Sequence, residues 1–543
     1  MRNEEKDQRV RPGWPRPAPG ALSGVLAGFT ALAVAELVAA AVRPQAGPVI
    51  AVGGASIDAT PAPVKDWAIR RFGTDDKLVL QLGILTVLTV LALVLGVAAV
   101  RFRRVGAAGV LLLGAVGAAA AVGRPDSTGL SDMLPSVVGA LAGALLLYIL
   151  TGRLAAVRRS PPSAYEVAGE RTGAGPPVSE GWDRRGFVLI AASAAAASAV
   201  VGAVGRSVNA SRGQDAVASR DKVVLPRPGS AAQPVPKRAG LRVAGISPFI
   251  TSNQSFYRVD TALVVPKVDA TTWQLRIHGE GVRRAATYSF GDLLGRELIE
   301  RDITLTCVSN EVGGPYVGNA RWIGVRLADL LAECGVKPPS QGGRADQLVA
   351  RSVDGMTIGS PVEEIMDGRD AMLALGMNGE PLPFEHGFPV RMVVPGLYGF
   401  VSACKWIEDI ELTTFDAYDP YWVKRGWARR APVKTESRID TPKPFARPEA
   451  GTVMVAGVAW AQHRGVDKVE VRVDDGAWQE AHLAPEDTRD TWRQWSFPWQ
   501  ATPGGHTLTV RATDRTGTVQ TRARTRTIPD GASGWHSVVV TVD

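Results

Sequence analysis

Long apolar stretches dominate the first 205 residues, and alternating polar and apolar positions dominate the rest. Four segments, at 22–42, 79–100, 106–123 and 133–151, consist almost entirely of small and aliphatic residues. Each approaches the roughly 20 residues that a helix needs to cross the hydrocarbon core of a bilayer. A fifth segment, 187–204, is Ala-rich and less hydrophobic. We therefore predict an N-terminal α-helical transmembrane bundle followed by soluble protein.

The segment from 241 to 445 mixes the strand period with the helix period. Alternating or continuous apolar runs predict strands at 273–278, 303–307 and 389–395, and helical spacing predicts a helix at 327–333. Strands and helices in one segment of this length indicate an α+β domain.

From about 446 the pattern changes to short alternating runs, at 453–458, 468–473 and 507–512. Asp474-Asp475-Gly476 separates two of them as a hairpin turn does. We predict an immunoglobulin-like β-sandwich over 446–543. Its core is expected to contain five tryptophans: Trp460, Trp478, Trp492, Trp495 and Trp499.

The charges beside the apolar segments predict their orientation. With the N-terminus inside, the inner segments 1–16, 101–104 and 153–185 carry fourteen lysines and arginines, and the outer loops carry six. The positive-inside rule therefore places the N-terminus in the cytoplasm and everything after residue 205 outside. We expect a multi-pass protein of the cell membrane with extracytoplasmic soluble domains.

Two arginines precede the fifth apolar segment, in Asp183-Arg184-Arg185-Gly186-Phe187. This run resembles the twin-arginine export signal, which carries folded, cofactor-loaded proteins. The alternative is an ordinary positively charged flank. The Ala-rich segment either remains as an anchor or is cleaved near 203–210.

The predicted organisation has five parts. These are 1–182, a four-helix transmembrane region with cytoplasmic ends; 183–206, the twin-arginine-like signal or anchor helix; 207–240, a Pro-rich extended linker; 241–445, the α+β domain; and 446–543, the β-sandwich.

Composition excludes several classes of function. The net charge of +8 lies largely in loops between apolar segments, so it reports membrane topology and not nucleic-acid binding. Three cysteines form no C-x-x-C pair, and no flavin or nicotinamide fingerprint occurs. The first histidine is His278, so the membrane half cannot build a bis-histidine haem. Glu36, within a predicted span, is interpreted as a satisfied interface residue.

Cys307 carries the clearest chemical signal. It closes the strand-like run Ile303-Thr-Leu-Thr306 and opens a Gly-rich loop ending near Trp322. A thiol in that position suits a nucleophile or a soft-metal ligand, although a buried packing cysteine is the alternative. Cys334 lies at a predicted helix end and is interpreted as packing. Cys404 precedes Lys405 in a segment better suited to phosphate contact.

The run Met377–Gly396, with Ser402–Trp406, resembles the sulfite oxidase family, and the resemblance covers roughly 241–543. It implies a sulfite-oxidase-type molybdopterin domain in which molybdenum is held by the pterin dithiolene and the Cys307 thiolate. The implied cofactor contacts are Asn253, Gln254, Tyr257, Arg258, Asp354, His386, Arg391, Ser402 and Lys405. In isolation His386 reads as a core histidine, Arg391 as a charge flanking a strand, and Asp354 as a turn residue before Gly355.

The residues expected around the substrate depart from sulfite oxidases. Ser252, Glu311 and Val312 replace arginines, and Trp427 replaces a tyrosine. Lys424 and Arg425 can supply some charge for a sulfite dianion. Segment 251–260 is closer to the methionine-sulfoxide-reductase branch, so a neutral sulfoxide or N-oxide is also plausible.

The resemblance implies oxygen-atom transfer to or from a small substrate, sulfite or of sulfoxide type. A separate cytochrome or quinone-linked protein would then exchange the electrons, and the C-terminal domain would mediate a homodimer. Two alternatives from other classes remain: a cofactor-free, membrane-anchored binding protein that retains the fold, and a surface adhesin built on the sandwich.

Overall fold

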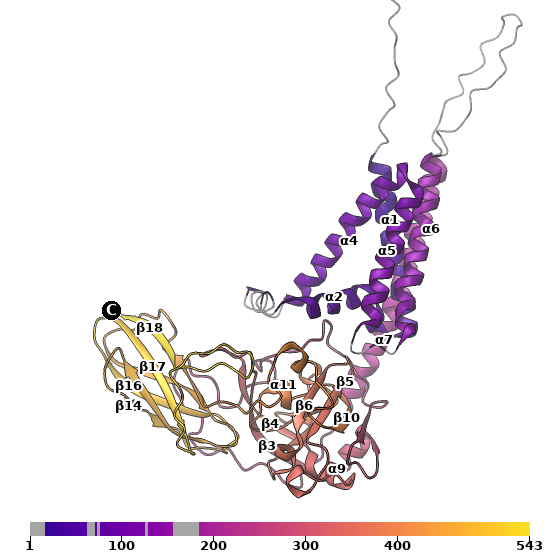
Figure 1. Cartoon of the computed structure of the whole chain (residues 1–543). Helices are drawn as coiled ribbons and strands as arrows, with labels where there is room; N and C mark the ends of the chain where they lie inside the picture. The colour runs from indigo at the N-terminus through magenta and orange to yellow at the C-terminus, as the bar shows by residue number, and fades with distance from the viewer. Residues whose placement is uncertain are drawn as a thin grey trace, which may run out of the picture. The chain divides into compact units, whose positions relative to one another are not determined.

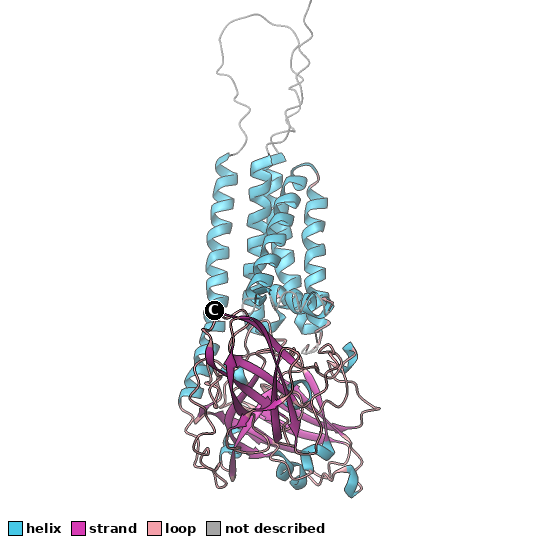
Figure 2. Ribbon diagram, turned by 90° about the vertical axis from the view of Figure 1, so that its left-hand side faces the viewer, coloured by secondary structure: helices cyan, strands magenta, loops and turns pink. Residues whose placement is uncertain are grey.

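The computed structural model divides into two compact units, Met1–Ser211 and Arg212–Asp543. It describes residues 17–61, 64, 71–72, 76–124, 127, 129–155 and 184–543. Figures 1 and 2 show that helices form the first unit and that strands gather in the second. Arg184 lies at the start of the described part of the twin-arginine-like run, and Asp183 lies outside the described residues.

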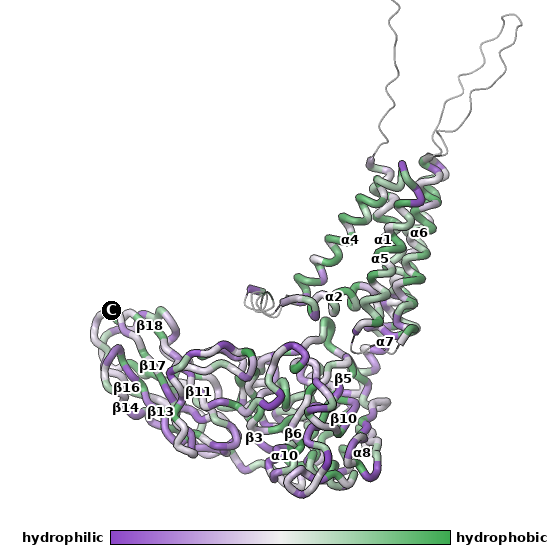
Figure 3. The backbone as a smooth tube through the Cα atoms, viewed as in Figure 1, coloured by the Kyte–Doolittle hydropathy of each residue, from purple (hydrophilic) through white to green (hydrophobic). Residues whose placement is uncertain are grey.

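Five helices in the described residues are long and apolar enough to cross a membrane. They are α1 (Pro17–Val42), α4 (Asp76–Arg101), α5 (Arg103–Val122), α6 (Leu134–Ala155) and α7 (Arg184–Asp221), with a shorter apolar helix, α2 (Pro48–Ala59), and the 3₁₀ turns η1 (Pro44–Ala46) and η3 (Leu130–Met133). All five predicted apolar segments are helical, and Figure 3 shows the hydrophobic colour along their lengths.

Small residues allow these helices to approach closely. A Cβ added to Gly24 on α1 would lie 2.9 Å from the Cα of Gly96 on α4. A Cβ on Gly143 of α6 would lie 2.7 Å from the carbonyl oxygen of Ala27 on α1. Helices in lipid associate through such close backbone packing, because lipid tails provide no hydrophobic driving force between them.

Several polar side chains within the bundle are paired. Glu36 accepts a hydrogen bond from the Asn209 amide at 3.1 Å, which agrees with its interpretation as a satisfied residue. Arg43 lies 2.6 Å from the fully buried Asp132. Such pairing offsets the cost of placing charge away from water.

The predicted extended linker is partly wrong, because α7 continues to Asp221. Residues 207–221 contain alanines and charged residues and no proline, so no proline interrupts the helix before its end at Asp221. The end of α7 and the residues that follow it pack within the second unit: the Arg220 guanidinium donates to the carbonyls of Pro381 and Leu382 at 2.8 Å, and Ser230 bridges to Ile299.

The α+β domain contains two five-stranded sheets. The first has the order β2-β1-β10-β5-β6, with β1 and β10 parallel; the second has the order β3-β4-β7-β8, with β9 also paired to β7. The strands are β1 (Gln274–Gly279), β2 (Ala286–Ser289), β3 (Leu298–Thr306), β4 (Val317–Arg326), β5 (Gln347–Ser352), β6 (Thr357–Pro361), β7 (Met372–Met377), β8 (Glu380–Pro381), β9 (Arg391–Val393) and β10 (Ile407–Thr413). The helices are α8 (Phe290–Leu294), α9 (Leu327–Glu333), α10 (Val362–Met366) and α11 (Gly399–Ser402), with the 3₁₀ turns η5 (Pro339–Gln341), η6 (Phe384–His386) and η7 (Val423–Arg425).

The C-terminal region is β-rich and forms two four-stranded antiparallel sheets, β11-β12-β16-β15 and β14-β13-β17-β18. Their strands are β11 (Glu436–Thr441), β12 (Gly451–Trp460), β13 (Val466–Val473), β14 (Gln479–Glu480), β15 (His482–Leu483), β16 (Arg493–Ala501), β17 (Gly504–Asp514) and β18 (His536–Val542). Apolar residues of both sheets share one core. The 474–476 turn joins β13 to β14, as expected of a hairpin.

The prediction for the five tryptophans is only partly right. Trp495 and Trp499 lie in the core between the two sheets. Trp460 and Trp492 belong instead to the core of the α+β domain, where the Trp492 indole donates to the Phe249 carbonyl at 2.9 Å. They lie at the end of β12 and just before β16, where the chain leaves the sandwich interior. Trp478 lies outside both cores, beneath the Arg511 guanidinium.

Candidate active site

Cys307 follows the last residue of β3, so the structure confirms its position at a strand end. Its backbone N–H closes the β3–β4 connection by donating to Tyr316 at 2.9 Å, and the Ser309 N–H donates to its thiol at 3.4 Å. The thiol is buried, and burial raises its pKa, an effect that the Ser309 bonds and Lys405 oppose. A cation and an N–H that favour the thiolate are what a metal-binding thiol requires.

Two cationic side chains lie in the same region. Arg391 begins β9, its guanidinium stacks 5.0 Å from the Trp322 ring, and it is 5% exposed. Lys405 has a side chain that is 9% exposed. Gly387 lies between them, since a Cβ there would come within 3.0 Å of Arg391 and 3.1 Å of Lys405. Its positive φ of 110° suits glycine, and the missing side chain keeps the two cations close.

Lys405 is paired with a carboxylate, whereas Arg391 has only a carbonyl partner among the described residues. Lys405 donates to the Asp260 carboxylate at 2.8 Å, which also accepts from Arg258 at 2.9 Å. Arg391 donates to the His386 carbonyl at 3.2 Å, and its buried Nε has no protein partner in the described part of the chain. Burial lowers the pKa of Arg391 to about 10 and that of Lys405 to about 8.

This arrangement fits an anionic ligand. A buried guanidinium with an unsatisfied N–H is costly unless a negative group compensates it. A phosphate would accept from Arg391 in two places and would take Lys405 as a point charge. The residues present therefore suit the phosphate of a pterin cofactor beside a thiolate metal ligand.

His386 is buried at the edge of this site and is held neutral. Its Nε2 donates to the Asn253 carbonyl at 2.9 Å, which leaves Nδ1 as an acceptor. Burial lowers its pKa to about 4. The Asn253 side chain is fixed in turn by the Asn378 amide, which donates to it at 2.8 Å. Segment 251–254 and the turn before β9 are therefore locked together.

Two tyrosines stand near the thiol. Burial raises the pKa of Tyr257, and the Cys307 charge adds to this effect. Burial likewise raises the pKa of Tyr398, to which Glu436 and, more weakly, Cys307 contribute. Both phenols therefore remain protonated at physiological pH, and the Tyr398 hydroxyl lies against the backbone N–H of Lys434, at 3.4 Å.

Other predicted residues take different positions. Gln254 is exposed. Ser402 is fully buried, and its hydroxyl contacts the carbonyls of Leu397 and Tyr398 at 3.0 Å, so it is occupied within α11. Asp354 lies in the turn between β5 and β6 and accepts from the Met356 N–H at 3.2 Å.

The residues predicted to meet the substrate form an aromatic group. Trp427 packs against Phe400 and Trp422 with ring centroids 5.1 and 5.0 Å apart. The exposed Lys424 and Arg425 lie over Tyr418 and Tyr421 respectively. Phe400 belongs to α11, whose first residue, Gly399, faces the carbonyl of Thr306 just before Cys307. The aromatic group therefore adjoins the strand end that carries the thiol.

Several contributors were not predicted. Asp260 links Lys405 to Arg258, Trp322 lies beneath Arg391, and Tyr398 stands beside α11. Their separations in sequence exceed 100 residues for Asp260 and Lys405, so no local pattern reveals the contact. A carboxylate ending the segment 251–260 was the one available signal.

Comparison with known proteins bears on this geometry. Residues 262–422 match the family described as "Oxidoreductase molybdopterin binding domain". The mouse protein "Sulfite oxidase, mitochondrial" is 31% identical over 293 residues, which cover 46% of this chain and 53% of the relative. "Uncharacterized oxidoreductase YuiH" of Bacillus subtilis is 32% identical over 162 residues, 30% of this chain and 75% of that protein. This chain belongs to the sulfite oxidase family of molybdopterin oxidoreductases.

The family assignment confirms the resemblance noted in the sequence and identifies molybdopterin as the cofactor of the central domain. The chain spans about half the length of the mitochondrial sulfite oxidases that it matches. The solved structure of the sulfane dehydrogenase SoxCD from Paracoccus pantotrophus is 25% identical, covering 55% of this chain and 84% of that chain, with a TM-score of 0.47.

The described residues contain no group of three or more His, Cys, Asp or Glu side chains placed to hold a metal ion. In this family a metal is presented by the pterin, so one protein thiol suffices. Cys307 is suited to that role because a soft thiolate matches the metal. Cys334, at the C-terminal cap of α9, packs in the apolar core, as predicted. Cys404 is buried in the same core.

Proposed function

We propose that this chain is a membrane-anchored, molybdopterin-dependent oxidoreductase that catalyses oxygen-atom transfer on the extracytoplasmic face. The observation that carries the proposal is the pairing of a buried thiol at Cys307 with a buried, incompletely satisfied guanidinium at Arg391. The Nε of Arg391 has no protein partner in the described residues, and together the two groups suit the two ends of the cofactor.

The site residues take separate roles in this proposal. Cys307 provides the thiolate ligand, and Arg391 and Lys405 bind the pterin phosphate. His386, held by Asn253, offers Nδ1 as an acceptor to the pterin ring, and Tyr257, Gln254 and Arg258 lie on the same segment. Ser402 and Asp354 position backbone at the edges of the site. The bound cofactor supplies two-electron oxygen-atom chemistry, which no side chain can perform.

The substrate is proposed to be small and uncharged, of the sulfoxide type, in preference to sulfite. Glu311 and Val312 follow Asn310 in place of the arginines of sulfite oxidases. Lys424 and Arg425 are exposed and lie over tyrosine rings. A dianion needs cations to offset its desolvation, whereas a sulfoxide needs only a hydrogen-bond donor, a role we propose for the protonated Tyr257 phenol.

For a sulfoxide, the S–O bond breaks, sulfur gains two electrons, and the oxygen leaves as water after taking up two protons. The electrons would come from a separate redox protein, such as a cytochrome or a quinone-linked subunit. For sulfite the reaction runs in the other direction, with water as the oxygen source and two electrons released.

The N-terminal unit is proposed to anchor the enzyme as a transmembrane bundle, with its N-terminus inside. The segment from 183 to 206 is proposed to act as a twin-arginine-like signal that is retained as an anchor. Five helices of membrane length and the distribution of flanking charges support this arrangement. The C-terminal sheets are proposed to form an immunoglobulin-like dimerisation domain.

Dye-linked assays on the purified full chain test the proposal. Methionine sulfoxide and a reduced viologen dye measure reduction, and sulfite with ferricyanide measures oxidation. Activity on the sulfoxide that Cys307→Ala abolishes supports the proposal. Activity on sulfite alone would overturn the substrate assignment, and molybdenum-loaded protein inactive in both directions would overturn the reaction class.

A further inference from the structure

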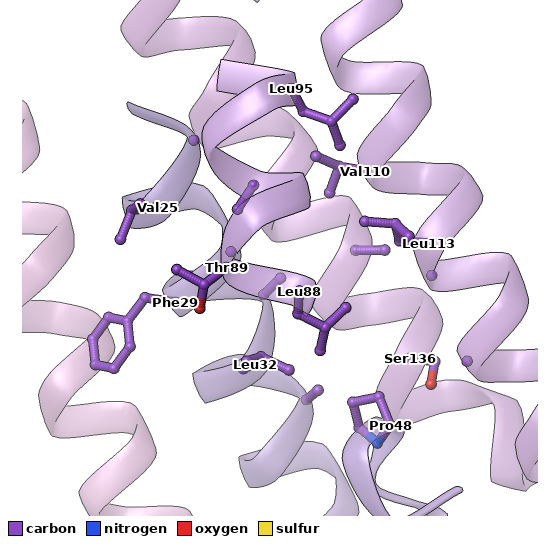
Figure 4. Close-up of a pocket in the computed structure, with 18 of the residues that line it drawn as sticks. Val25, Phe29, Leu32, Pro48, Leu88, Thr89, Leu95, Val110, Leu113 and Ser136 are labelled. Carbon is purple, nitrogen blue, oxygen red and sulfur yellow. The ribbon is translucent and has the colours of Figure 1, made fainter. Parts of the chain in front are cut away.

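A cavity lies within the helical bundle, and the residues that line it are far in sequence from those of the proposed cofactor site. Its volume is about 280 Å³, and Figure 4 shows its lining. The walls come from α1, α2, α4, α5 and α6 and are almost wholly apolar, with Leu32, Leu88, Leu95, Val110 and Leu113 among them.

Small residues create this space. Gly28, Ala31, Gly114 and Ala140 lie on the walls where larger side chains would fill it. Membrane helices are held together by close packing, so an unfilled space between them forfeits contacts along the walls that line it. The exposed Phe29 and Leu85 on those walls show that the space opens to the outer surface of the bundle. A ligand that fills the cavity would restore those contacts.

The shape of the cavity indicates a chain-like occupant. Its wall on α4 runs from Leu85 to Leu95, a rise of about 15 Å. Since a cavity of about 150 Å³ accommodates one benzene ring, the volume corresponds to roughly ten to twelve carbon atoms. A single hydrocarbon chain has this length and bulk.

Ser136 provides a polar group at one end. It lies in the first turn of α6, is 3% exposed, lines the cavity beside Pro48, and its hydroxyl has no hydrogen-bond partner in the described residues. Hydroxyls elsewhere in the bundle bond the carbonyl four residues earlier, as Ser23 and Thr89 do at 2.8 and 2.7 Å. A buried hydroxyl without a partner is costly, so it marks a position where a ligand oxygen would be stabilised.

The charges at that end favour a neutral head group. Arg43, after α1, is paired with Asp132 just before α6, and Arg124, after α5, donates to the carbonyl of Ile50 on α2 at 3.2 Å. Both guanidinium groups are already engaged, whereas a phosphate would require cations to compensate its charge.

We propose that the bundle cavity binds an uncharged amphiphile, with its hydrocarbon chain between α1, α4 and α5 and a carbonyl or hydroxyl oxygen bonded to Ser136. An isoprenoid quinone and a diacylglycerol share this chemistry. The proposal rests on the bundle alone and does not depend on the cofactor site.

The test uses the full chain in phosphatidylcholine nanodiscs with two photoreactive probes, an azido-decylbenzoquinone and a diazirine-bearing diacylglycerol. Saturable labelling of peptides within 85–95 is expected with at least one probe. Competition by unlabelled decylbenzoquinone or by unlabelled diacylglycerol identifies the source.

Matched variants locate the site. Gly28→Leu fills the cavity, and the nearest atom to a Cβ there is 3.4 Å away, so the helix should tolerate it. Gly83→Leu on the same set of helices adds the same side chain where nothing lies within 4 Å. Labelling should fall at least tenfold in Gly28→Leu and remain unchanged in Gly83→Leu.

A second pair of variants tests the hydrogen bond to the Ser136 hydroxyl. Ser136→Ala should weaken probe affinity about fivefold, the effect of one lost hydrogen bond, while Ser23→Ala should not. This pair decides the matter if Gly28→Leu fails to fold. Labelling that does not saturate, or that is equal in wild type and Ser136→Ala, would overturn the proposal, as would equal labelling by a diazirine-bearing phosphatidylcholine.

Discussion

The proposed cofactor site and the bundle cavity are built by opposite means. The proposed cofactor site draws Cys307, Arg391 and Lys405 from separate segments of the chain and gathers charges that the protein itself does not fully balance. The bundle cavity exists because glycines and alanines line it in place of larger residues. Among the described residues that line it, the Ser136 hydroxyl is the one polar side-chain atom without a hydrogen-bond partner.

The difference shows how the surroundings determine what a site can bind. In the second unit, sheets hold side chains rigidly enough to keep an uncompensated cation buried, so the site selects an anion. In the bundle, the walls of the cavity are almost wholly apolar, so the site selects by shape and by one hydrogen bond. An ionic ligand and an apolar ligand are therefore the expected occupants of the two sites.

The largest effect should follow from removing the thiol. Cys307→Ser is expected to lower dye-linked activity by at least a thousandfold while pterin content stays near that of wild type, because Arg391 and Lys405 still bind the phosphate. Cys334→Ala, which removes a buried thiol away from the site, is the control and should retain activity. Activity within tenfold of wild type in Cys307→Ser would show that the thiol is not the ligand.

The buried histidines should make the second unit acid-sensitive. His386 and His536 have pKa values lowered to about 4 by burial, whereas histidine in an unfolded chain titrates near pH 6.5. The unfolded state therefore binds more protons between pH 6.5 and 4, and stability falls as the pH decreases through that window. Each histidine contributes about 3 kcal/mol to this loss.

Thermal unfolding of the full chain between pH 7.5 and 4 checks this expectation. Below pH 6.5 the unfolding temperature of His536→Gln should fall less with decreasing pH than that of the wild type, whereas substitution of the exposed His482 should leave the pH dependence unchanged. A slope that is identical in wild type and His536→Gln would refute the assignment of this effect to buried histidine.

Arg391 tests the ionic character of the cofactor site. Arg391→Met retains bulk but removes the charge, and loss of a charge-assisted bond should reduce pterin content roughly 10- to 100-fold. Arg391→Lys should recover part of it, as a point charge without the bidentate geometry. Arg296→Met, at an exposed ion pair with Glu333, serves as control. Full pterin loading in Arg391→Met would remove the basis for placing the phosphate there.

The smallest effects should come from the rim of the site. Trp427→Ala opens the aromatic group beside Phe400 and should lower kcat/KM for a sulfoxide about tenfold. Lys424→Ala should change it by less than threefold, because an uncharged substrate makes no ionic contact. A loss with Lys424→Ala greater than with Trp427→Ala would favour an anionic substrate such as sulfite.

The sequence predicted the helices and the strand that carries Cys307 because both depend on local periodicity. It also pointed to Arg391 and Lys405 through a long family-like run. It did not predict Asp260 as the partner of Lys405, nor the unsatisfied Nε of Arg391, since both arise from contacts between distant segments. The helical course of 207–221 was missed because the prolines that follow it suggested an extended chain.

The same limit applies to the tryptophans. The apolar bulk of Trp460 and Trp492 predicted their burial correctly but not which core receives them. Hydropathy likewise predicted five apolar helices but not the cavity, because a cavity depends on which small residues face one another across helices. The sequence pattern indicates which residues are buried, but the fold is needed to know which residues they pack against.

Molybdenum and pterin content of the purified full-length chain tests the central claim most directly. Inductively coupled plasma mass spectrometry and fluorescence of the oxidised pterin should each give a stoichiometry of about one per chain when the protein is produced in a host that makes the cofactor. Protein that is folded and matured in such a host yet contains neither molybdenum nor pterin would contradict the assignment of Cys307 and Arg391 to a cofactor site.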